Sequence, residues 1–170
     1  MKRVVLQLSW RFPQTHSRKG ELTHFREKLR NAINGTEYTV SDRNTAKIKG
    51  RKIHTIRLNF ERWKHNIGKI ADGGFALSVR QWKGSPYKSK QDEMFLLREN
   101  VGYQRISLSY DPDTDKVRAV IDGKGMADVE QIANNDGLSL KDFKEWFFGE
   151  NPKEKKLITG VVIHFTDFRY

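Results

Sequence analysis

The segment Lys49-Gly50-Arg51-Lys52-Ile53-His54-Thr55-Ile56-Arg57 carries the clearest structural signal in this chain. Gly50 marks a turn, and the β-branched residues behind it favour a strand because they pack well on a pleated surface. The same segment holds four cations, a histidine and a threonine hydroxyl. A strand bordered by lysine and arginine resists edge-to-edge aggregation and attracts anions. The segment therefore predicts a strand over residues 53–56 at an anion-binding surface.

On either side of this segment, the spacing of apolar residues predicts the remaining elements. Helical spacing predicts helices over residues 22–33, 60–70, 127–134 and the segment after Ser139. Alternation predicts strands over residues 4–10, 75–82, 94–97, 106–110, 117–121 and 157–165. Asn59 and Ser139 are suited to N-caps, and Gly35 is suited to end a helix. Five to seven strands with about four helices predict an α+β domain, and the pattern alone leaves an α/β sandwich open.

Bulk composition limits the class of protein. The 170 residues include 19 aromatic side chains (4 Trp, 5 Tyr and 10 Phe), which predicts one folded domain over residues 1–170. The chain has no cysteine, so disulfides and thiolate zinc sites are excluded. The five histidines show no metal-ligand spacing, and no cofactor is predicted. No apolar run approaches the ~20 residues of a membrane span, which favours a cytoplasmic protein.

The charge is unevenly distributed along the chain. There are 32 basic and 21 acidic residues, which gives +11. Residues 43–69 carry nine Lys/Arg and one acid, and residues 80–90 add four cations and no acid. Residues 111–150 carry ten acids and five bases. Clustered cations among aromatic residues are typical of proteins that bind phosphate backbones, so a nucleic acid is the predicted partner.

Two parts of the chain resemble ASCH domains. Residues 50–57, Gly-Arg-Lys-Ile-His-Thr-Ile-Arg, resemble the family's Gly-x-Lys-x-x-Thr-Ile-Arg signature. Residues 132–140, followed by Phe143 and Trp146, resemble its acidic residue before a capped helix, and residues 161–165 are similar to its closing strand. The resemblance implies a PUA-like fold, a small mixed β-barrel.

The same resemblance implies three catalytic residues: Lys52, Thr55 and Asp136. In similar ASCH proteins the matching lysine, threonine and acid are the catalytic residues of an acetylcytidine amidohydrolase. A lysine of lowered pKa can act as a base, a hydroxyl can attack an amide carbon, and a carboxylate can orient the other two. This chain departs from the family by carrying Asp136 where the family has Glu. A regular strand would also place Lys52 and Thr55 on opposite faces, so a bend before the strand is required.

Nucleic-acid contacts are predicted in the two basic segments. Arg51 and Arg57 suit phosphate or a structural ion pair, and His54 suits a phosphate or proton partner. Trp82 ends a strand beside a basic loop and is the preferred base-stacking residue, whereas Trp63 lies on a helical apolar stripe and is expected in the core. The predicted contact residues are Lys49, Arg51, Lys52, His54, Arg57, Arg80, Trp82, Lys83, Lys88 and Lys90.

Three hypotheses follow for function. The leading one is a nucleic-acid-associated module with a basic cleft, for RNA or a modified nucleoside. The alternative is an enzyme, either an amidohydrolase on an acylated nucleoside or a ribonuclease, using Lys52, Thr55 and Asp136. The third is an adaptor that binds a basic protein partner through the acidic residues 111–150.

Overall fold

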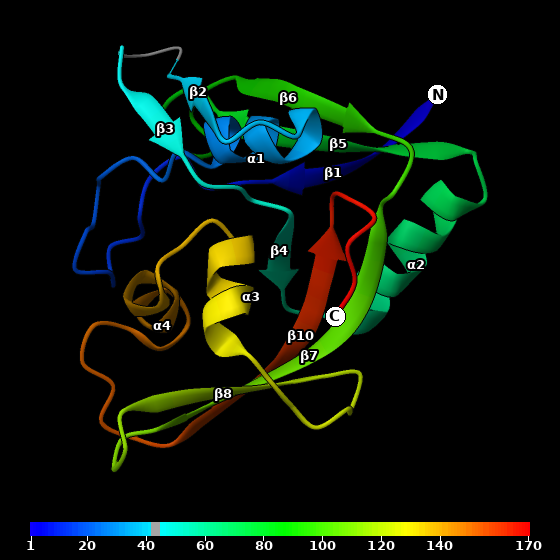
Figure 1. Ribbon diagram of the computed structural model, residues 1–170. Coiled ribbons are helices and arrows are strands. Elements are labelled where there is room, and N and C mark those ends of the chain that lie inside the picture. Colours follow the sequence, from blue (N-terminus) through cyan, green and yellow to red (C-terminus); the bar gives the residue numbers. More distant parts are fainter. Residues whose placement is uncertain (42–44) are drawn as a thin grey trace.

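The computed structural model describes residues 1–41 and 45–170, and this part of the chain forms an α+β fold of four helices and ten strands (Figure 1). The helices are α1 (Phe25–Asn34), α2 (Phe60–Ala71), α3 (Val129–Asn135) and α4 (Leu140–Phe148). The strands are β1 (Lys2–Gln7), β2 (Tyr38–Val40), β3 (Lys47–Lys49), β4 (His54–Arg57), β5 (Phe75–Trp82), β6 (Gln91–Leu97), β7 (Gly102–Asp111), β8 (Lys116–Ile121), β9 (Met126–Ala127) and β10 (Lys156–His164). Arg43, the first cation of the basic segment 43–69, lies outside the described residues.

The strands form three sheets. The largest has the order β4-β10-β7-β8-β9 and is antiparallel throughout. A second sheet has the order β1-β5-β6, in which β1 and β5 are parallel, and β2 pairs with β3 as a separate hairpin. Within the described residues the hydrogen-bonded ladders do not close into a barrel.

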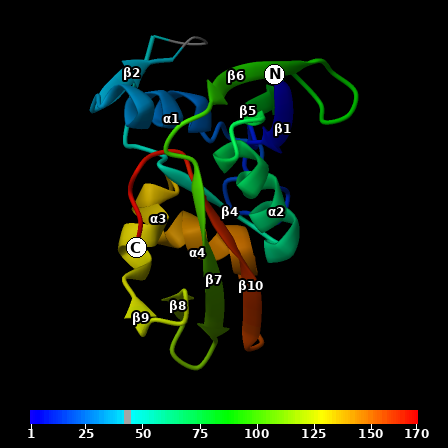
Figure 2. The same ribbon diagram turned by 90° about the vertical axis from the view of Figure 1, so that its right-hand side faces the viewer.

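The core lies on both faces of β10. Val161, Val162 and Ile163 are consecutive and all fully buried, which explains why this strand is apolar without alternation. In Figures 1 and 2, α2 lies on one side of β10 and β7, and α3 and α4 lie on the other. Trp63 and Ile67 of α2 belong to the buried core, so the prediction that Trp63 is a core residue is confirmed.

The local signals place most elements correctly. All seven predicted strands are present, and the predicted caps Asn59 and Ser139 each accept a backbone N–H at the start of their helices. The prediction of five to seven strands is too low because β2, β3 and β9 have only two or three residues, which is too short for a periodic pattern. The first helix also begins later than predicted, because His24 adopts a left-handed conformation just before Phe25.

Candidate active site

Lys52 and Asp136 are 84 residues apart in sequence, and the fold brings them into contact. The extended segment before β4 runs beside the end of α3, where the Ile53 N–H donates to the Asn135 carbonyl at 2.8 Å. Asp136 is the C-cap residue of α3, so its position is fixed by the helix end. Thr55 follows on β4, which pairs with the buried strand β10.

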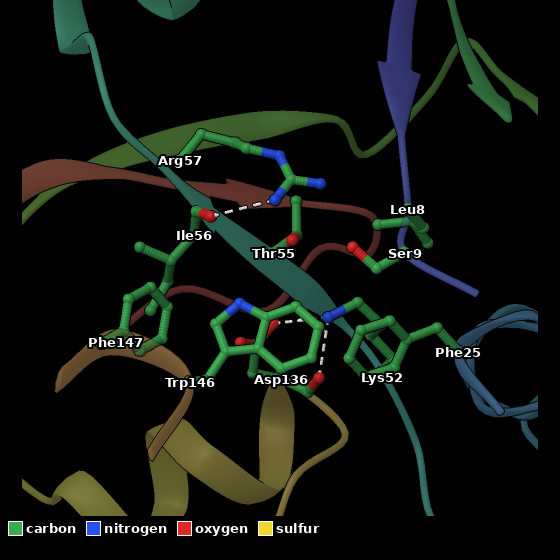
Figure 3. Close-up of a pocket in the computed structure, with 10 residues that line it drawn as sticks. All are labelled: Leu8, Ser9, Phe25, Lys52, Thr55, Ile56, Arg57, Asp136, Trp146 and Phe147. Carbon is green, nitrogen blue, oxygen red and sulfur yellow. Dashed lines mark hydrogen bonds and ion pairs between the residues drawn. The ribbon is translucent and has the colours of Figure 1, made fainter. Parts of the chain in front are cut away.

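The start of β4 explains why Lys52 and Thr55 share a pocket. The strand covers only residues 54–57, so Lys52 precedes it and is free of the strand's alternation. The Lys52 N–H instead donates to the Lys28 carbonyl of α1 at 3.0 Å. Both side chains line the same pocket, together with Asp136 (Figure 3). The bend that the sequence required is this irregular segment before the strand.

Lys52 and Asp136 form a buried ion pair. Lys52 Nζ lies 2.5 Å from Asp136 Oδ1 and donates to the Asp136 backbone carbonyl at 2.7 Å. It also lies 3.9 Å from the centre of the Phe25 ring. Lys52 is 1% exposed and Asp136 is 3% exposed. A buried ammonium requires such partners, because leaving it unpaired away from water is costly.

Burial shifts both members of the pair toward their neutral forms. Desolvation lowers the pKa of Lys52 from 10.5 to about 8, although the charge and hydrogen bond of Asp136 act in the opposite direction. Desolvation likewise raises the pKa of Asp136, against the effect of Lys52. Such shifts, caused by burial next to a specific charged partner, are characteristic of functional sites.

The pocket around the pair, called here the Lys52 pocket, is small and enclosed (Figure 3). Its cavity volume is about 10 Å³, which is close to the space that one water molecule occupies. Polar groups and aromatic rings alternate around it. Its lining residues are Leu8, Ser9, Phe25, Lys52, Thr55, Ile56, Arg57, Asp136, Trp146 and Phe147. Ser9 and Phe25 were not predicted as site residues, because no sequence motif connects them to the signature strand.

A polar contact holds together two walls of the pocket. The loop that follows Ser9 is joined to α4, the helix that supplies Trp146 and Phe147. Arg18 Nη1 lies 2.7 Å from Asp142 Oδ2, and the Ser17 N–H donates to Glu145 Oε2 at 3.0 Å. We refer to these interactions as the loop–α4 contact.

A buried histidine belongs to the same contact. His16 Nε2 lies 3.1 Å from the Asp142 carbonyl, and the His16 ring lies 6.4 Å from the Trp146 ring. The partners in the loop–α4 contact are 124 to 128 residues apart, and no pattern in the sequence indicates that they meet.

Several predicted nucleic-acid contacts are internal. His54 is 0% exposed, so the prediction that it meets phosphate at the surface is not supported by its position. Lys52 is likewise buried. Arg57 is half-buried, lines the Lys52 pocket and donates to the carbonyls of Gln7 and Ile56. Arg80 is half-buried and donates to Ser78 Oγ at 2.8 Å. In these side chains contacts with distant parts of the chain decide the environment, not the local charge density.

The exposed cations form two groups. Lys49 and Arg51 lie at the end of β3 and just after it, and Arg51 donates to the carbonyls at positions 35 and 36. Lys83, Lys88 and Lys90 are exposed around the turn between β5 and β6. In Figure 2 the β2–β3 hairpin lies on one side of α1, and the β5–β6 turn projects from the opposite side of the upper layer. The two groups of exposed cations are therefore carried by different sheets, and a single basic cleft that includes both stays a prediction.

The turn over residues 83–90, called here the basic turn, also presents two aromatic rings. Trp82 is half-buried at the end of β5, and its ring lies 5.3 Å from that of Tyr87, which is 91% exposed. Ser89 Oγ accepts from the Gly84 N–H at 3.0 Å and donates to the Ser85 carbonyl at 3.0 Å. The turn is therefore held by its own hydrogen bonds, while the Tyr87 ring and the three lysines are exposed to solvent.

Most carboxylates of the acidic segment 111–150 have partners within the chain. Asp115 binds Lys144 at 2.9 Å, and Asp122 accepts from Gln104 at 2.9 Å. Asp128 caps α3, Asp136 pairs with Lys52, and Asp142 takes part in the loop–α4 contact. This segment consequently offers a partner protein far fewer free carboxylates than its composition indicates.

Comparisons of the chain with protein-family models, with curated proteins and with solved structures found no match. Among the described residues, no three or more His, Asp or Glu side chains are grouped in a way that could hold a metal ion. None of the helices in residues 1–41 and 45–170 has the length and apolar character needed to cross a membrane.

Proposed function

We propose that this chain is a hydrolase that removes an acyl group from the amine of a nucleoside or nucleic-acid base. The observation that carries the proposal is the convergence of Lys52, Thr55 and Asp136 on one enclosed polar pocket. The substrate class comes from the resemblance to ASCH domains. Membership of that family, a PUA-like barrel and a cytoplasmic location are parts of the same proposal.

In this mechanism Lys52 is the base and Thr55 the nucleophile. Because its pKa is about 8, a fraction of the Lys52 amine is neutral near pH 7. The neutral amine takes the Thr55 hydroxyl proton while Oγ1 forms a bond to the acyl carbon. The C–N bond then breaks, and the leaving amine receives the proton from Lys52. Water finally hydrolyses the Thr55 ester and releases the acid.

The other pocket residues have supporting roles. Asp136 holds the Lys52 amine in the pocket through the 2.5 Å contact until a substrate binds, and it accepts from the Lys52 ammonium again after turnover. The Arg57 guanidinium lines the pocket and can stabilise the negative charge on the acyl oxygen. Phe25 and Trp146, whose ring centres lie 5.6 Å apart in the closed pocket, would offer flat apolar faces to a base ring once the pocket has opened.

Turnover of an acylated cytidine and of short RNAs, followed by mass spectrometry, tests the proposal. Thr55→Val should lower kcat at least 100-fold while Thr55→Ser retains most of it, because only the first removes the hydroxyl. Lys52→Met should be as severe, and the double variant should be no worse than either single one. Lys28→Met is the matched control, since Lys28 is a nearby half-buried lysine that donates to the Gly137 carbonyl at 2.6 Å.

The outcomes separate the alternatives. Full activity of Thr55→Val, or no turnover of any acylated substrate, would contradict the proposal. Cleavage of RNA oligomers with release of a new end would assign a ribonuclease to the same pocket instead.

A second candidate function, binding of single-stranded nucleic acid, is favoured by the basic turn. Its exposed Tyr87 ring beside Trp82, among three exposed lysines, has the composition of a base-stacking surface with an electrostatic attraction for phosphate. This function does not require the Lys52 pocket, so both proposals can be tested on the same protein.

A further inference from the structure

Asp136 faces a second polar group, formed by the buried His54 and the half-buried Tyr170, in addition to its lysine partner. His54 Nε2 lies 2.7 Å from Tyr170 Oη, and Asn135 Nδ2 donates to that oxygen at 3.0 Å. Gln104 fixes the backbone of Tyr170 in both directions, because its Oε1 accepts from the Tyr170 N–H at 2.8 Å and its Nε2 donates to the Tyr170 carbonyl at 3.1 Å. The Tyr170 hydroxyl is thus presented to His54 from a fixed position.

The partners of Tyr170 Oη indicate which atom donates in its hydrogen bond with His54. The Asn135 amide nitrogen can only donate, so Tyr170 Oη accepts from it, and we assign the Tyr170 hydroxyl proton to the contact with His54 Nε2. Burial keeps the pKa of His54 well below its ordinary range, so the ring is neutral. A neutral imidazole that accepts at Nε2 carries its proton on Nδ1.

This Nδ1–H has Asp136 in front of it. The distance from His54 Nδ1 to Asp136 Oδ1 is 3.8 Å, and Nδ1 has no hydrogen-bond partner among the described residues. An N–H···O bond of about 3.0 Å requires an approach of about 0.8 Å. A carboxylate has lone pairs for several donors, so the contact with Lys52 does not prevent a second one.

We propose that His54, oriented by Tyr170, is a positioning residue that donates to the Asp136 carboxylate when Lys52 turns from it to a ligand. The proposal rests on the proposed function, because Lys52 has to release Asp136 in order to act on a substrate. A buried carboxylate without a donor is strongly disfavoured. His54 removes that obstacle, since its Nδ1 lies only 3.8 Å from the carboxylate oxygen Oδ1.

Nitrogen-15 NMR of the imidazole rings tests the donor chain directly. At pH 7 the wild-type His54 should be the Nδ1-protonated tautomer, with its signals assigned by their loss in His54→Gln. Tyr170→Phe removes only the hydroxyl and should raise the Nε2-protonated fraction severalfold. Tyr103→Phe is the matched control, because Tyr103 packs against Phe60 and not against His54, and it should leave the tautomer unchanged.

A second experiment tests whether His54 donates to Asp136 when the Lys52 ammonium is absent. In Lys52→Met the His54 Nδ1–H should move downfield and exchange with water at least tenfold more slowly, as it bonds to Asp136. An Nε2-protonated His54 in the wild-type protein would overturn the proposal, and the only variant that this measurement uses is His54→Gln, for the assignment. These signals need no substrate, so an absence of turnover with the expected tautomer would refute the hydrolase and not the donor chain.

Discussion

Lys52 and the lysines of the basic turn are the same residue type in opposite environments. Lys52 is buried, bound to one carboxylate and surrounded by aromatic rings, whereas Lys83, Lys88 and Lys90 are exposed to solvent. The first environment lowers the pKa of a single amine, which is the property that a general base requires. The second preserves charge that acts at a distance on a charged partner. The two regions should therefore respond differently to mutation, pH and salt.

The largest effect is expected when the buried pair is broken. Asp136→Ala should lower the free energy of unfolding by about 3–5 kcal/mol, because it leaves the buried Lys52 amine without its carboxylate partner. The double variant Lys52→Met/Asp136→Leu should recover most of this loss. Urea unfolding measures both.

An exposed ion pair provides the control for that experiment. Glu61 lies 3.4 Å from Arg105 on the surface, and Glu61→Ala should cost at most about 1 kcal/mol. If Asp136→Ala costs no more than Glu61→Ala, the buried pair does not have the role in stability assigned to it here.

The next effect concerns pH. The folded pKa of Lys52 is about 8 and its ordinary value is 10.5, so between these values the unfolded chain holds a proton that the folded chain has released. The free energy of unfolding should therefore rise with pH through this window, by roughly 3 kcal/mol. Below pH 8, where the buried Lys52 is protonated, the protein should show the full loss of stability. The double variant Lys52→Met/Asp136→Leu lacks this group and should show no such rise. The difference in unfolding free energy between the wild type and the double variant should grow with pH. If it is flat or falls, the lowered pKa of Lys52 is contradicted.

The smallest effect on stability is expected at the basic turn. Reversing all three charges, as Lys83→Glu/Lys88→Glu/Lys90→Glu, should change the unfolding free energy by no more than about 0.5 kcal/mol per site, because the side chains are exposed. Binding of single-stranded RNA should nevertheless weaken. The slope of log K against log salt is negative, and its magnitude should decrease by about 0.7 for each phosphate that the protein no longer neutralises.

Two further variants sharpen this test. Reversal of Lys116, Lys153 and Lys156, which are exposed elsewhere, should affect RNA binding less than reversal of the turn. Trp82→Ala should weaken binding by about 1–3 kcal/mol, because it removes a ring on which a base can stack. RNA binding that is equally sensitive to both sets of charges would show a nonspecific attraction instead of a surface at the turn.

The sequence predicts the fold class well because its long elements are periodic. Val4, Leu6 and Leu8 alternate along β1 and just beyond it as buried residues, and the α2 stripe through Trp63 and Ile67 faces the core. The three-dimensional arrangement of the sheets depends on contacts between distant segments, and no pattern within a window of ten residues encodes it.

The candidate site could be predicted only in part. The resemblance picked out Lys52, Thr55 and Asp136, and the structure places them around one pocket, although their catalytic role stays a prediction. The burial of His54 was missed because a histidine among cations resembles a surface residue until its strand pairs with β10. The exposed cations lie in two groups on different sheets. The sequence did not indicate this, because the order of charges along a chain does not show which sheet carries each segment.

The small volume of the Lys52 pocket has a consequence for the rates of ligand exchange. A space of about 10 Å³ admits water and no nucleoside, so the substrate proposed above requires a wider pocket, which separation of the loop from α4 would provide. The apparent Kd then exceeds the intrinsic one by the reciprocal of the open fraction, so that an open fraction of about 1% weakens binding about 100-fold. The observed association rate levels off with concentration at the rate of opening. In the proposed hydrolase, selection among substrates would therefore begin with the time that the loop–α4 contact spends broken, before any ligand reaches Lys52.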